Sequence, residues 1–354
     1  MTIAKTRCGK GNKAQRLMSV LKDKRTLLIV MQDFPDPDAI GAAAALRELA
    51  RSQGDVTTTL ACGGFVSRAE NRALLKYLGL NVQSMTNTPP GNYDCIALVD
   101  TQPGAGNNAL DPLVVPHIVV DHHPIRPLTR KALFSDVRKR YGATSSIFQE
   151  YMQCAGVPVP VPLATALLYG IRSDTADFGR EATQGDINAF LSLYPSSNKR
   201  MLGRIAMARV PRAYFRTIAA ALTRAQSAGA CVFTNLGTVD NPDIVSEVAD
   251  LLLRDEETTW ALALGLHRDE LLISVRSSDV SADAGKLMHH LVGKLGSGGG
   301  HTAMAGGQIK VESSDTAVVD ALAETVIRRF LKKLGAKRSD LHMLLEGRAS
   351  AAFQ

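Results

Sequence analysis

The sequence predicts an α/β protein with two domains, because apolar runs along its first half end in acidic residues. Such an ending is typical of a buried parallel strand at its carboxyl end. Helical patterns separate the runs, which indicates a parallel sheet covered on both faces. The runs are Thr26–Met31 before Asp33, Asp36 and Asp38, then Cys95–Val99 before Asp100, and His117–Val120 before Asp121.

Residues 26–195 are predicted to form the first domain. Ala39–Arg51 has the apolar spacing of a helix, with Asp38 as its N-cap or as an acid of its first turn. The other elements expected here are a strand at Val56–Ala61, a helix at Arg68–Leu78, a loop at Asn107–Pro116, and helices at Ser145–Ala155 and Leu163–Arg172, the last followed by Asp174.

A basic helical stretch, residues 196–228, predicts a linker to a second domain at residues 229–335, followed by a weakly patterned tail at residues 336–354. Within the second domain we expect strands at Ala230–Thr234, Thr258–Leu266, Glu270–Arg276 and Gln308–Val311, and helices at Pro242–Leu253, Ala282–Val292 and Ser314–Leu334.

The net charge of +7 belongs to the first 25 residues, a basic N-terminal segment. This segment holds eight Lys and Arg against one acid, whereas the remaining 33 bases and 33 acids cancel. A solvated or frayed terminus is the simpler interpretation. A non-specific nucleic-acid arm is the alternative.

Composition argues against a membrane or disulfide-rich protein. No apolar run approaches the roughly 18 residues that a spanning helix needs, and the start of the chain lacks the apolar core of a signal peptide. The five cysteines are scattered, with no CxxC pair, so reduced thiols and a cytoplasmic location are expected.

Acids at several strand ends, together with His122 and His123, are predicted to meet at one edge of the sheet. They cannot all stay charged and unpaired, so divalent metal ions are the simplest explanation. Oxygen and imidazole ligands without thiolate favour Mn²⁺, with Mg²⁺ as the alternative.

Six motifs, in this order, resemble those of the DHH phosphoesterase superfamily. The first four are DFPDPDAIG, LVDT, VDHHP and GIRSDTADF. The last two, SVRSSD and GSGGGHTAMAGG, resemble the DHH-associated domain of its nanoRNase branch. The resemblance covers residues 25 to 335. It implies a parallel-sheet domain, a smaller α/β domain with a mixed sheet, and an active-site cleft between them.

The resemblance also implies roles for single residues. His123 would face the scissile phosphate or the leaving group, and Asp121 would orient the imidazoles. The implied metal ligands are Asp100 as the bridge between two ions, Asp36 at the first ion, and Asp38, His122 and Asp174 at the second. The family's first motif usually opens with a histidine ligand, and here that position is Gln32. Whether Gln32 or Asp33 completes the first site is open.

In the second domain, the resemblance assigns the Gly-rich segment to the substrate. Gly298, Gly299 and Gly300 would let backbone N–H groups approach a phosphate, and a helix starting at His301 would add its dipole. Arg276, at a strand end, would pair with a phosphate. The alternative is an ordinary glycine turn.

The function implied is metal-dependent hydrolysis of short 5′-phosphorylated oligonucleotides or linear dinucleotides, extending to 3′-phosphoadenosine 5′-phosphate. One alternative is a degenerate, non-catalytic nucleotide sensor, and another is a pyrophosphatase or polyphosphatase. The expected partners are short oligonucleotides or nucleotides and no membrane, with a homodimer as an open alternative.

Overall fold

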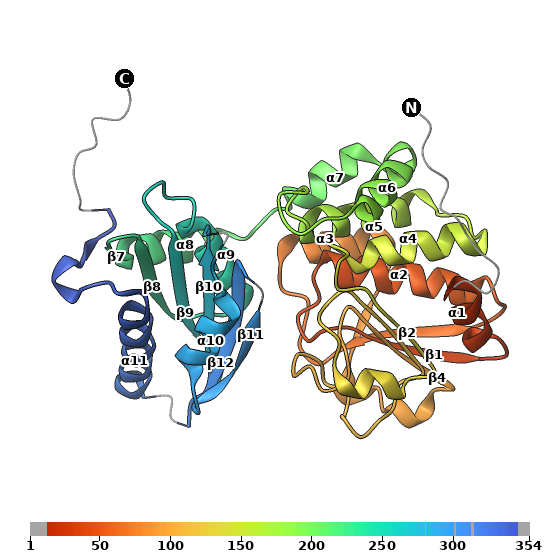
Figure 1. Cartoon of the computed structure of the whole chain (residues 1–354), viewed down its shortest axis with the longest axis horizontal. Coiled ribbons are helices and arrows are strands. Elements are labelled where there is room, and N and C mark those ends of the chain that lie inside the picture. The colour runs from red at the N-terminus through yellow and green to blue at the C-terminus, as the bar shows by residue number, and fades with distance from the viewer. Residues whose placement is uncertain (1–12, 280, 301, 313–314, 346–354) are drawn as a thin grey trace. The chain divides into compact units, whose positions relative to one another are not determined.

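The computed structural model describes residues 13–279, 281–300, 302–312 and 315–345, which fall in two compact units (Figure 1). The units divide between Arg209 and Val210, inside the stretch predicted as a linker. Its helix α7 (Lys199–Ala206) packs against α3 (Ala69–Leu78) and α5 (Val161–Asp174) of the first unit, whereas α8 (Arg212–Arg224) packs in the second. The predicted linker is therefore shared between the two cores.

The first unit is built on a six-stranded sheet in the order β3-β2-β1-β4-β5-β6, with every neighbouring pair parallel. Its strands are β1 (Thr26–Val30), β2 (Thr57–Cys62), β3 (Val82–Ser84), β4 (Cys95–Val99), β5 (Ile118–Asp121) and β6 (Phe134–Val137). Its other helices are α1 (Lys13–Leu21), α2 (Pro37–Arg51), α3 (Ala69–Leu78), α4 (Thr144–Ala155), α5 (Val161–Asp174) and α6 (Gln184–Leu193).

The strand order reverses between β1 and β4, so the carboxyl ends of these strands flank a topological switch point. Ligands of open α/β sheets bind at such a point. Helices cover one face of the sheet around a large core, as predicted (Figure 1). The other face carries a smaller core of Leu28, Val30 and Leu98 under loop residues such as Leu110 and Val114. We expected helices on both faces of the sheet, and for this face the expectation is wrong.

Residues 1–12 of the basic N-terminal segment lie outside the described residues. For the rest of the segment, the expectation of a frayed terminus is wrong. Residues 13–21 form α1, with Leu17 and Leu21 fully buried. Lys13 pairs with Asp136, which is buried and accepts a hydrogen bond from the Tyr151 hydroxyl. An apolar face at helical spacing therefore decides the structure here despite the charge.

The second unit carries a seven-stranded mixed sheet in the order β11-β12-β10-β9-β8-β7-β13, in which β8 and β9 are parallel and the other pairs antiparallel. Its strands are β7 (Gln226–Ala228), β8 (Cys231–Thr238), β9 (Trp260–His267), β10 (Glu270–Ser277), β11 (Gly296–Gly300), β12 (Met304–Lys310) and β13 (His342–Met343). Helices α10 (Ala284–Val292) and α11 (Thr316–Leu334) pack on one core, and α8 and α9 (Asp243–Leu252) pack on another.

Four smaller expectations need correction. The predicted Gly-rich loop is the edge strand β11, paired with β12. No helix begins after it among the described residues, because residues 302–303 form a bend before β12. Part of the predicted tail joins the sheet as β13. Cys62, Cys95 and Cys231 are free thiols, but Cys154 is disulfide-bonded, so reduced thiols were wrongly expected at that position.

Among the described residues, no helix is both long enough and apolar enough to cross a membrane.

Candidate metal centre

The strand ends deliver the predicted acids to one place in the first unit. Asp100 follows β4, and its backbone N–H donates to the Val120 carbonyl of β5, which ties the two strand ends together. Its φ of 59° is left-handed, a conformation that Asp tolerates better than most residues. This turn directs the chain away from the sheet beside His122 and His123.

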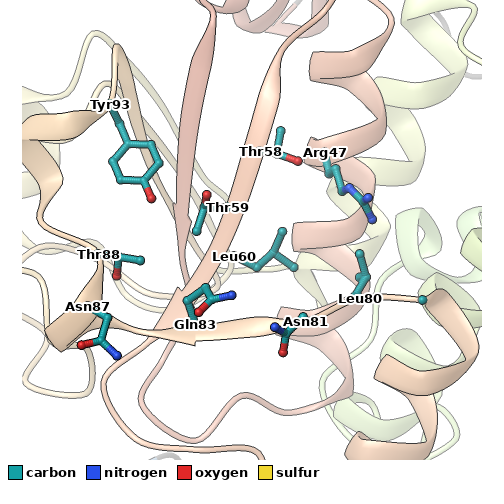
Figure 2. Close-up of a pocket in the computed structure, with 11 residues that line it drawn as sticks. Arg47, Thr58, Thr59, Leu60, Leu80, Asn81, Gln83, Asn87, Thr88 and Tyr93 are labelled. Carbon is teal, nitrogen blue, oxygen red and sulfur yellow. The ribbon is translucent and has the colours of Figure 1, made fainter.

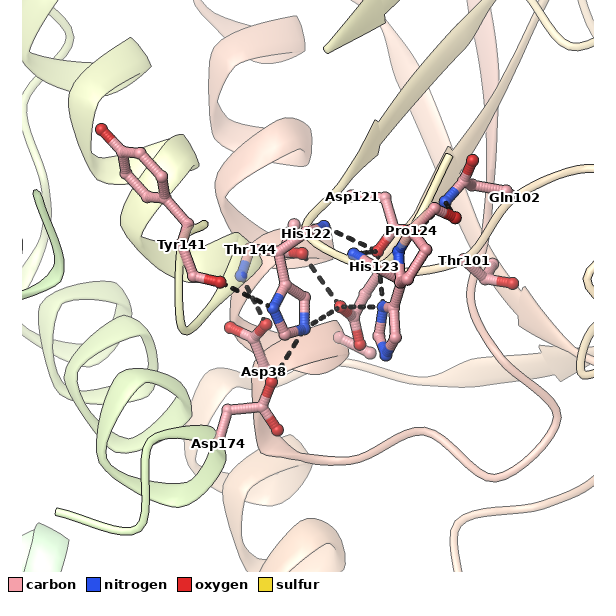
Figure 3. Close-up of polar contacts among 12 residues, drawn as sticks. Asp38, Thr101, Gln102, Asp121, His122, His123, Pro124, Tyr141, Thr144 and Asp174 are labelled. Carbon is pink, nitrogen blue, oxygen red and sulfur yellow. Dashed lines mark hydrogen bonds and ion pairs between the residues drawn. The ribbon is translucent and has the colours of Figure 1, made fainter. Parts of the chain in front are cut away.

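His122 is held in one tautomer with its other nitrogen facing acids. Its Nδ1 lies 3.1 Å from the Tyr141 carbonyl oxygen, which can only accept, so Nδ1 carries the proton. Nε2 lies 3.0 Å from Asp174 Oδ2 and 3.6 Å from Asp100 Oδ1 (Figure 3). With Nδ1 held by the Tyr141 carbonyl, Nε2 points at two carboxylates, an arrangement that favours a positive charge at Nε2, from either a proton or a metal ion.

The electrostatics of His122 give the same answer. Burial opposes its protonation, but Asp174, Asp100 and Asp38 raise its pKa well above the usual range. Nε2 is buried and makes no well-aligned hydrogen bond. The site thus favours a positive charge at this nitrogen, which either a proton or a metal ion supplies.

Asp38 lies fully buried in the first turn of α2 and caps a different helix. Its two oxygens accept from Thr144 N at 2.6 Å and Ser145 N at 2.7 Å, at the start of α4 (Figure 3). Burial, Asp174 and Asp36 together raise its pKa to about 7 despite these bonds. It is a first-turn acid of α2, as predicted, but not the N-cap, which is Asp36 accepting from Ala39 N at 2.9 Å.

Asp100 has one oxygen without a partner. Oδ1 accepts from Thr144 Oγ1 at 2.9 Å, but Oδ2 is buried with no hydrogen bond among the described residues. Burial, then Asp38 and Asp36, raises its pKa well above the usual range. An orphaned carboxylate oxygen among like charges fits a bound cation, and Asp38, His122 and Asp174 bring ligand atoms within 4.8 Å of one another. The residues present therefore fit a divalent metal.

Asp121 and His123 form a separate pair. Asp121 Oδ1 accepts from His123 Nδ1 at 2.7 Å and from the backbone N–H of His122 at 2.8 Å, and Oδ2 accepts from Gln102 Nε2 at 2.6 Å. Burial opposes ionisation of Asp121, but the bonds from His123 lower its pKa to about 2. Its lone pairs are occupied, so the geometry favours the positioning role that the resemblance implied.

Gln32 and Asp33 face different parts of the structure. A hydrogen bond from the Gln32 side chain opposes the rise in the pKa of Asp36, which burial and Asp174 cause. Asp33 instead accepts from the backbone N–H groups of Gly63, at 3.1 Å, and Ala109. The structure thus places Gln32, and not Asp33, beside the acids of the first site.

Sequence reasoning missed three residues that hold the site. Tyr141 fixes the tautomer of His122 through its carbonyl, Thr144 contacts both Asp38 and Asp100, and buried Gln102 secures Asp121. Tyr141 and Thr144 belong to the segment YGATSS, which leads into the first turn of α4 and whose small and hydroxyl residues signal a helix start. No signal in the sequence marks a carbonyl as a histidine partner.

In the second unit, the predicted phosphate-binding residue Arg276 already donates hydrogen bonds within the protein. Arg276 is 7% exposed, and its guanidinium donates to Asp250 at 2.5 Å, to Ser274 and to the Val275 carbonyl. Three of its donors are therefore already used within the protein, and its role toward phosphate stays a prediction. His301 lies outside the described residues.

The glycines of β11 separate into two kinds. A Cβ on Gly298 would lie 2.7 Å from Met288 Cγ, and one on Gly300 would lie 2.3 Å from the Met304 oxygen, so packing alone requires glycine there. Gly299 and its cross-strand partner Gly306 have open space where a Cβ would stand. Bare backbone faces that space, as close approach of a ligand requires.

Comparison with known proteins gives the family. Residues 27–171 match the DHH family, N-terminal domain, and residues 229–330 match the DHHA1 domain. A protein of Methanocaldococcus jannaschii, itself uncharacterized, is 32% identical over 344 residues, covering 95% of this chain and 69% of that protein. A probable manganese-dependent inorganic pyrophosphatase of Lactobacillus gasseri is 30% identical over 149 residues, covering 42% of this chain and 47% of that protein.

Solved structures share the fold. An exopolyphosphatase-related protein of Bacteroides fragilis superposes with a TM-score of 0.68 at 16% identity, covering 93% of this chain and 99% of that chain. RecJ of Thermus thermophilus in complex with Mn²⁺ gives a TM-score of 0.51 at 15% identity, covering 94% of this chain and 56% of that chain. With both domains matched in order, the chain belongs to the DHH superfamily of phosphoesterases and carries a DHHA1 domain after its DHH domain.

Proposed function

We propose that this chain is a metal-dependent phosphodiesterase that hydrolyses short 5′-phosphorylated oligonucleotides or linear dinucleotides, with 3′-phosphoadenosine 5′-phosphate as a further substrate. The observation that carries the proposal is a cluster of ligand atoms from Asp38, His122 and Asp174, beside an Asp100 oxygen that has no hydrogen bond among the described residues. A pure binding module has no use for this arrangement, because unneutralised carboxylates repel phosphate.

The residues divide into proposed metal ligands and one residue, His123, that would face the substrate. Asp36, Asp38, Asp100, His122 and Asp174 would hold two divalent ions, of which manganese fits the all-oxygen and imidazole set best. When bound, such ions lower the pKa of water and neutralise charge on the phosphoryl oxygens. Gln32 would leave the first ion with a weaker donor than imidazole.

His123 is the group placed to handle a proton. Its Nδ1–H donates to Asp121, which leaves Nε2 as the other ring nitrogen of a side chain that is 33% exposed. Nε2 can then donate a hydrogen bond to the leaving oxygen or to the scissile phosphate. Asp121 keeps that orientation because its own oxygens are bound by Gln102 and by the backbone of His122.

Two features outside the metal centre support an oligonucleotide over a free inorganic anion. Gly299 and Gly306 present open backbone in the DHHA1 domain, which suits close approach by a substrate phosphate. Residues 187–239 contain seven Lys and Arg and no acid. Six of these are arginines with exposed side chains, including Arg200, Arg212 and Arg216. A polyanion longer than a single phosphate would benefit from this stretch.

The test is a hydrolysis panel with manganese: a 5′-phosphorylated dinucleotide, the same dinucleotide without its 5′-phosphate, 3′-phosphoadenosine 5′-phosphate and pyrophosphate. We expect kcat/KM to be highest for the 5′-phosphorylated dinucleotide. Gly299→Leu should raise KM mainly for that substrate, whereas Gly91→Leu, at an open position of the first unit, should not. Preference for pyrophosphate would replace the proposal with the pyrophosphatase alternative, and binding without turnover would replace it with the sensor.

A further inference from the structure

A notch opens in the outer edge of the first sheet, away from the metal centre. Strand β3 pairs only with Leu60–Cys62, so among the described residues the first half of β2, Thr57–Thr59, has no strand partner on that side. A pocket of about 510 Å³ fills the gap, within the range of small-molecule sites. It lies beside the amino-terminal half of β2, whereas the metal centre lies at the carboxyl ends of β1, β4 and β5.

The cation in this notch is Arg47, which projects from α2 next to the pocket (Figure 2). Within the described part of the chain, its guanidinium makes no hydrogen bond or ion pair. Burial lowers its pKa, and the like charge of Arg51 one turn later lowers it further. Glu48, the next residue, raises the pKa, but it makes no ion pair with Arg47. A half-buried arginine that makes no hydrogen bond or ion pair with the described residues is unusual, and an anion in the pocket would supply such a contact.

The main chain adds one donor and one acceptor. In a parallel ladder, the N–H and C=O of successive residues point to opposite sides. Thr57 N donates to the Arg25 carbonyl on the β1 side, so the N–H and C=O of Thr58 point to the opposite side, into the notch. The Thr58 hydroxyl also lines the pocket, on the same side of the strand as Arg47 (Figure 2).

The rest of the lining is rich in amides. Asn81 and Gln83 come from the β3 segment and Asn87 from the turn that follows it, while the Tyr93 ring approaches from the other side of β2 (Figure 2). Each amide offers both donors and an acceptor, which is the pattern that a nucleobase edge presents in return. A tyrosine face suits a planar base.

We propose that this notch binds a nucleoside monophosphate, with its phosphate on Arg47 and Thr58 and its base among Tyr93, Asn81 and Gln83. Four separate segments of the chain converge on the pocket, which distinguishes it from a single charged helix face. The ligand is of the class that the proposed reaction releases, but the argument rests on the notch alone. The inference therefore stands or falls separately from the proposed function.

Binding is measured by calorimetry on the full chain in excess chelator, so that the metal centre is not loaded and turnover does not contribute. The probes are AMP, GMP, CMP, UMP, ribose 5-phosphate and inorganic phosphate. We expect saturable binding of at least one nucleotide, about tenfold tighter than ribose 5-phosphate or phosphate.

Variants locate the site. Arg47→Gln and, separately, Asn81→Ala should each weaken nucleotide binding about tenfold or more. Arg51→Gln removes the same charge one turn away, at an exposed residue that does not line the pocket, and should change the affinity less than twofold. Absence of nucleotide binding, phosphate binding as tight as any nucleotide, or equal losses in Arg47→Gln and Arg51→Gln would overturn the proposal.

Discussion

Replacing Asp100 by Asn tests whether the acid cluster exists to hold metal. Asn tolerates the left-handed φ of 59°, and its carbonyl oxygen still accepts from Thr144 Oγ1. The change therefore keeps the backbone and this hydrogen bond, and it removes one charge from a group of mutually repelling carboxylates. Ala would lose the hydrogen bond and strain the backbone as well, so Asn is the sharper substitution.

The magnitude follows from binding linkage. An ion present at 100 times its Kd stabilises the folded protein by about 2.7 kcal/mol. In a domain of roughly 150–250 residues, each kcal/mol of stabilisation raises Tm by about 2–4 °C. Binding of one ion should therefore raise Tm by roughly 5–11 °C. We expect wild type to gain at least this much with manganese, and Asp100→Asn to gain less than half of it, because it loses one oxygen of the carboxylate proposed to bridge the two ions.

In excess chelator we expect the relative stability of wild type and Asp100→Asn to change. Burial, Asp38 and Asp36 make ionised Asp100 unfavourable without metal, so Asp100→Asn should be at least as stable as wild type there. Differential scanning fluorimetry with and without manganese measures all four states. Asp240→Asn, the same change at an exposed residue of the second unit, is the matched control and should behave as wild type. Equal manganese shifts in wild type and Asp100→Asn would refute the reasoning.

Three further predictions concern the surroundings of the site. Gln32→His should raise manganese affinity about tenfold or more, because it adds an imidazole donor; titration of manganese followed by activity or calorimetry checks this, and an unchanged Kd would show that the position needs no imidazole. Asp121→Asn should lower kcat roughly 10–100-fold at unchanged manganese affinity, because it frees the ring of His123; a matching loss of metal binding would make Asp121 a ligand instead. Asp136→Asn should lower the free energy of unfolding at pH 7 by about 3–5 kcal/mol. Burial opposes ionisation of Asp136, but Arg138 lowers its pKa below the ordinary value, so this stabilisation is present above the unfolded pKa of about 3.9 and disappears as pH falls through the folded value. The gap to wild type in urea unfolding should therefore shrink toward pH 3, and a constant gap would contradict the ion-pair explanation.

The sequence predicted the parallel sheet and the place of the acids because both depend on local patterns. Cys95–Val99 is a strand with the predicted bounds, since five buried apolar residues before an acid have few other interpretations. Asp36, Asp38, Asp100 and His122 could be placed at one edge because carboxyl ends of parallel strands meet there, whereas Asp174, at the end of a helix, was assigned through the family resemblance.

Other features depend on contacts that no local pattern carries. The Gly296–Gly300 segment forms a strand because tertiary pairing with β12 overrides the low strand preference of glycine. The direction of the Asp33 side chain follows from the turn at Gly63, thirty residues away. The engagement of Arg276 by Asp250 depends on how α9 packs against β10.

The central claim is that these acids and His122 form a two-metal centre. Anomalous diffraction from crystals of the full chain grown with manganese, recorded on both sides of the manganese absorption edge, tests it most directly. We predict two anomalous peaks about 3.5–4 Å apart, with the Asp100 carboxylate between them and His122 Nε2 bound to one. No peak, or manganese only at sites remote from Asp100 and His122, would contradict the account.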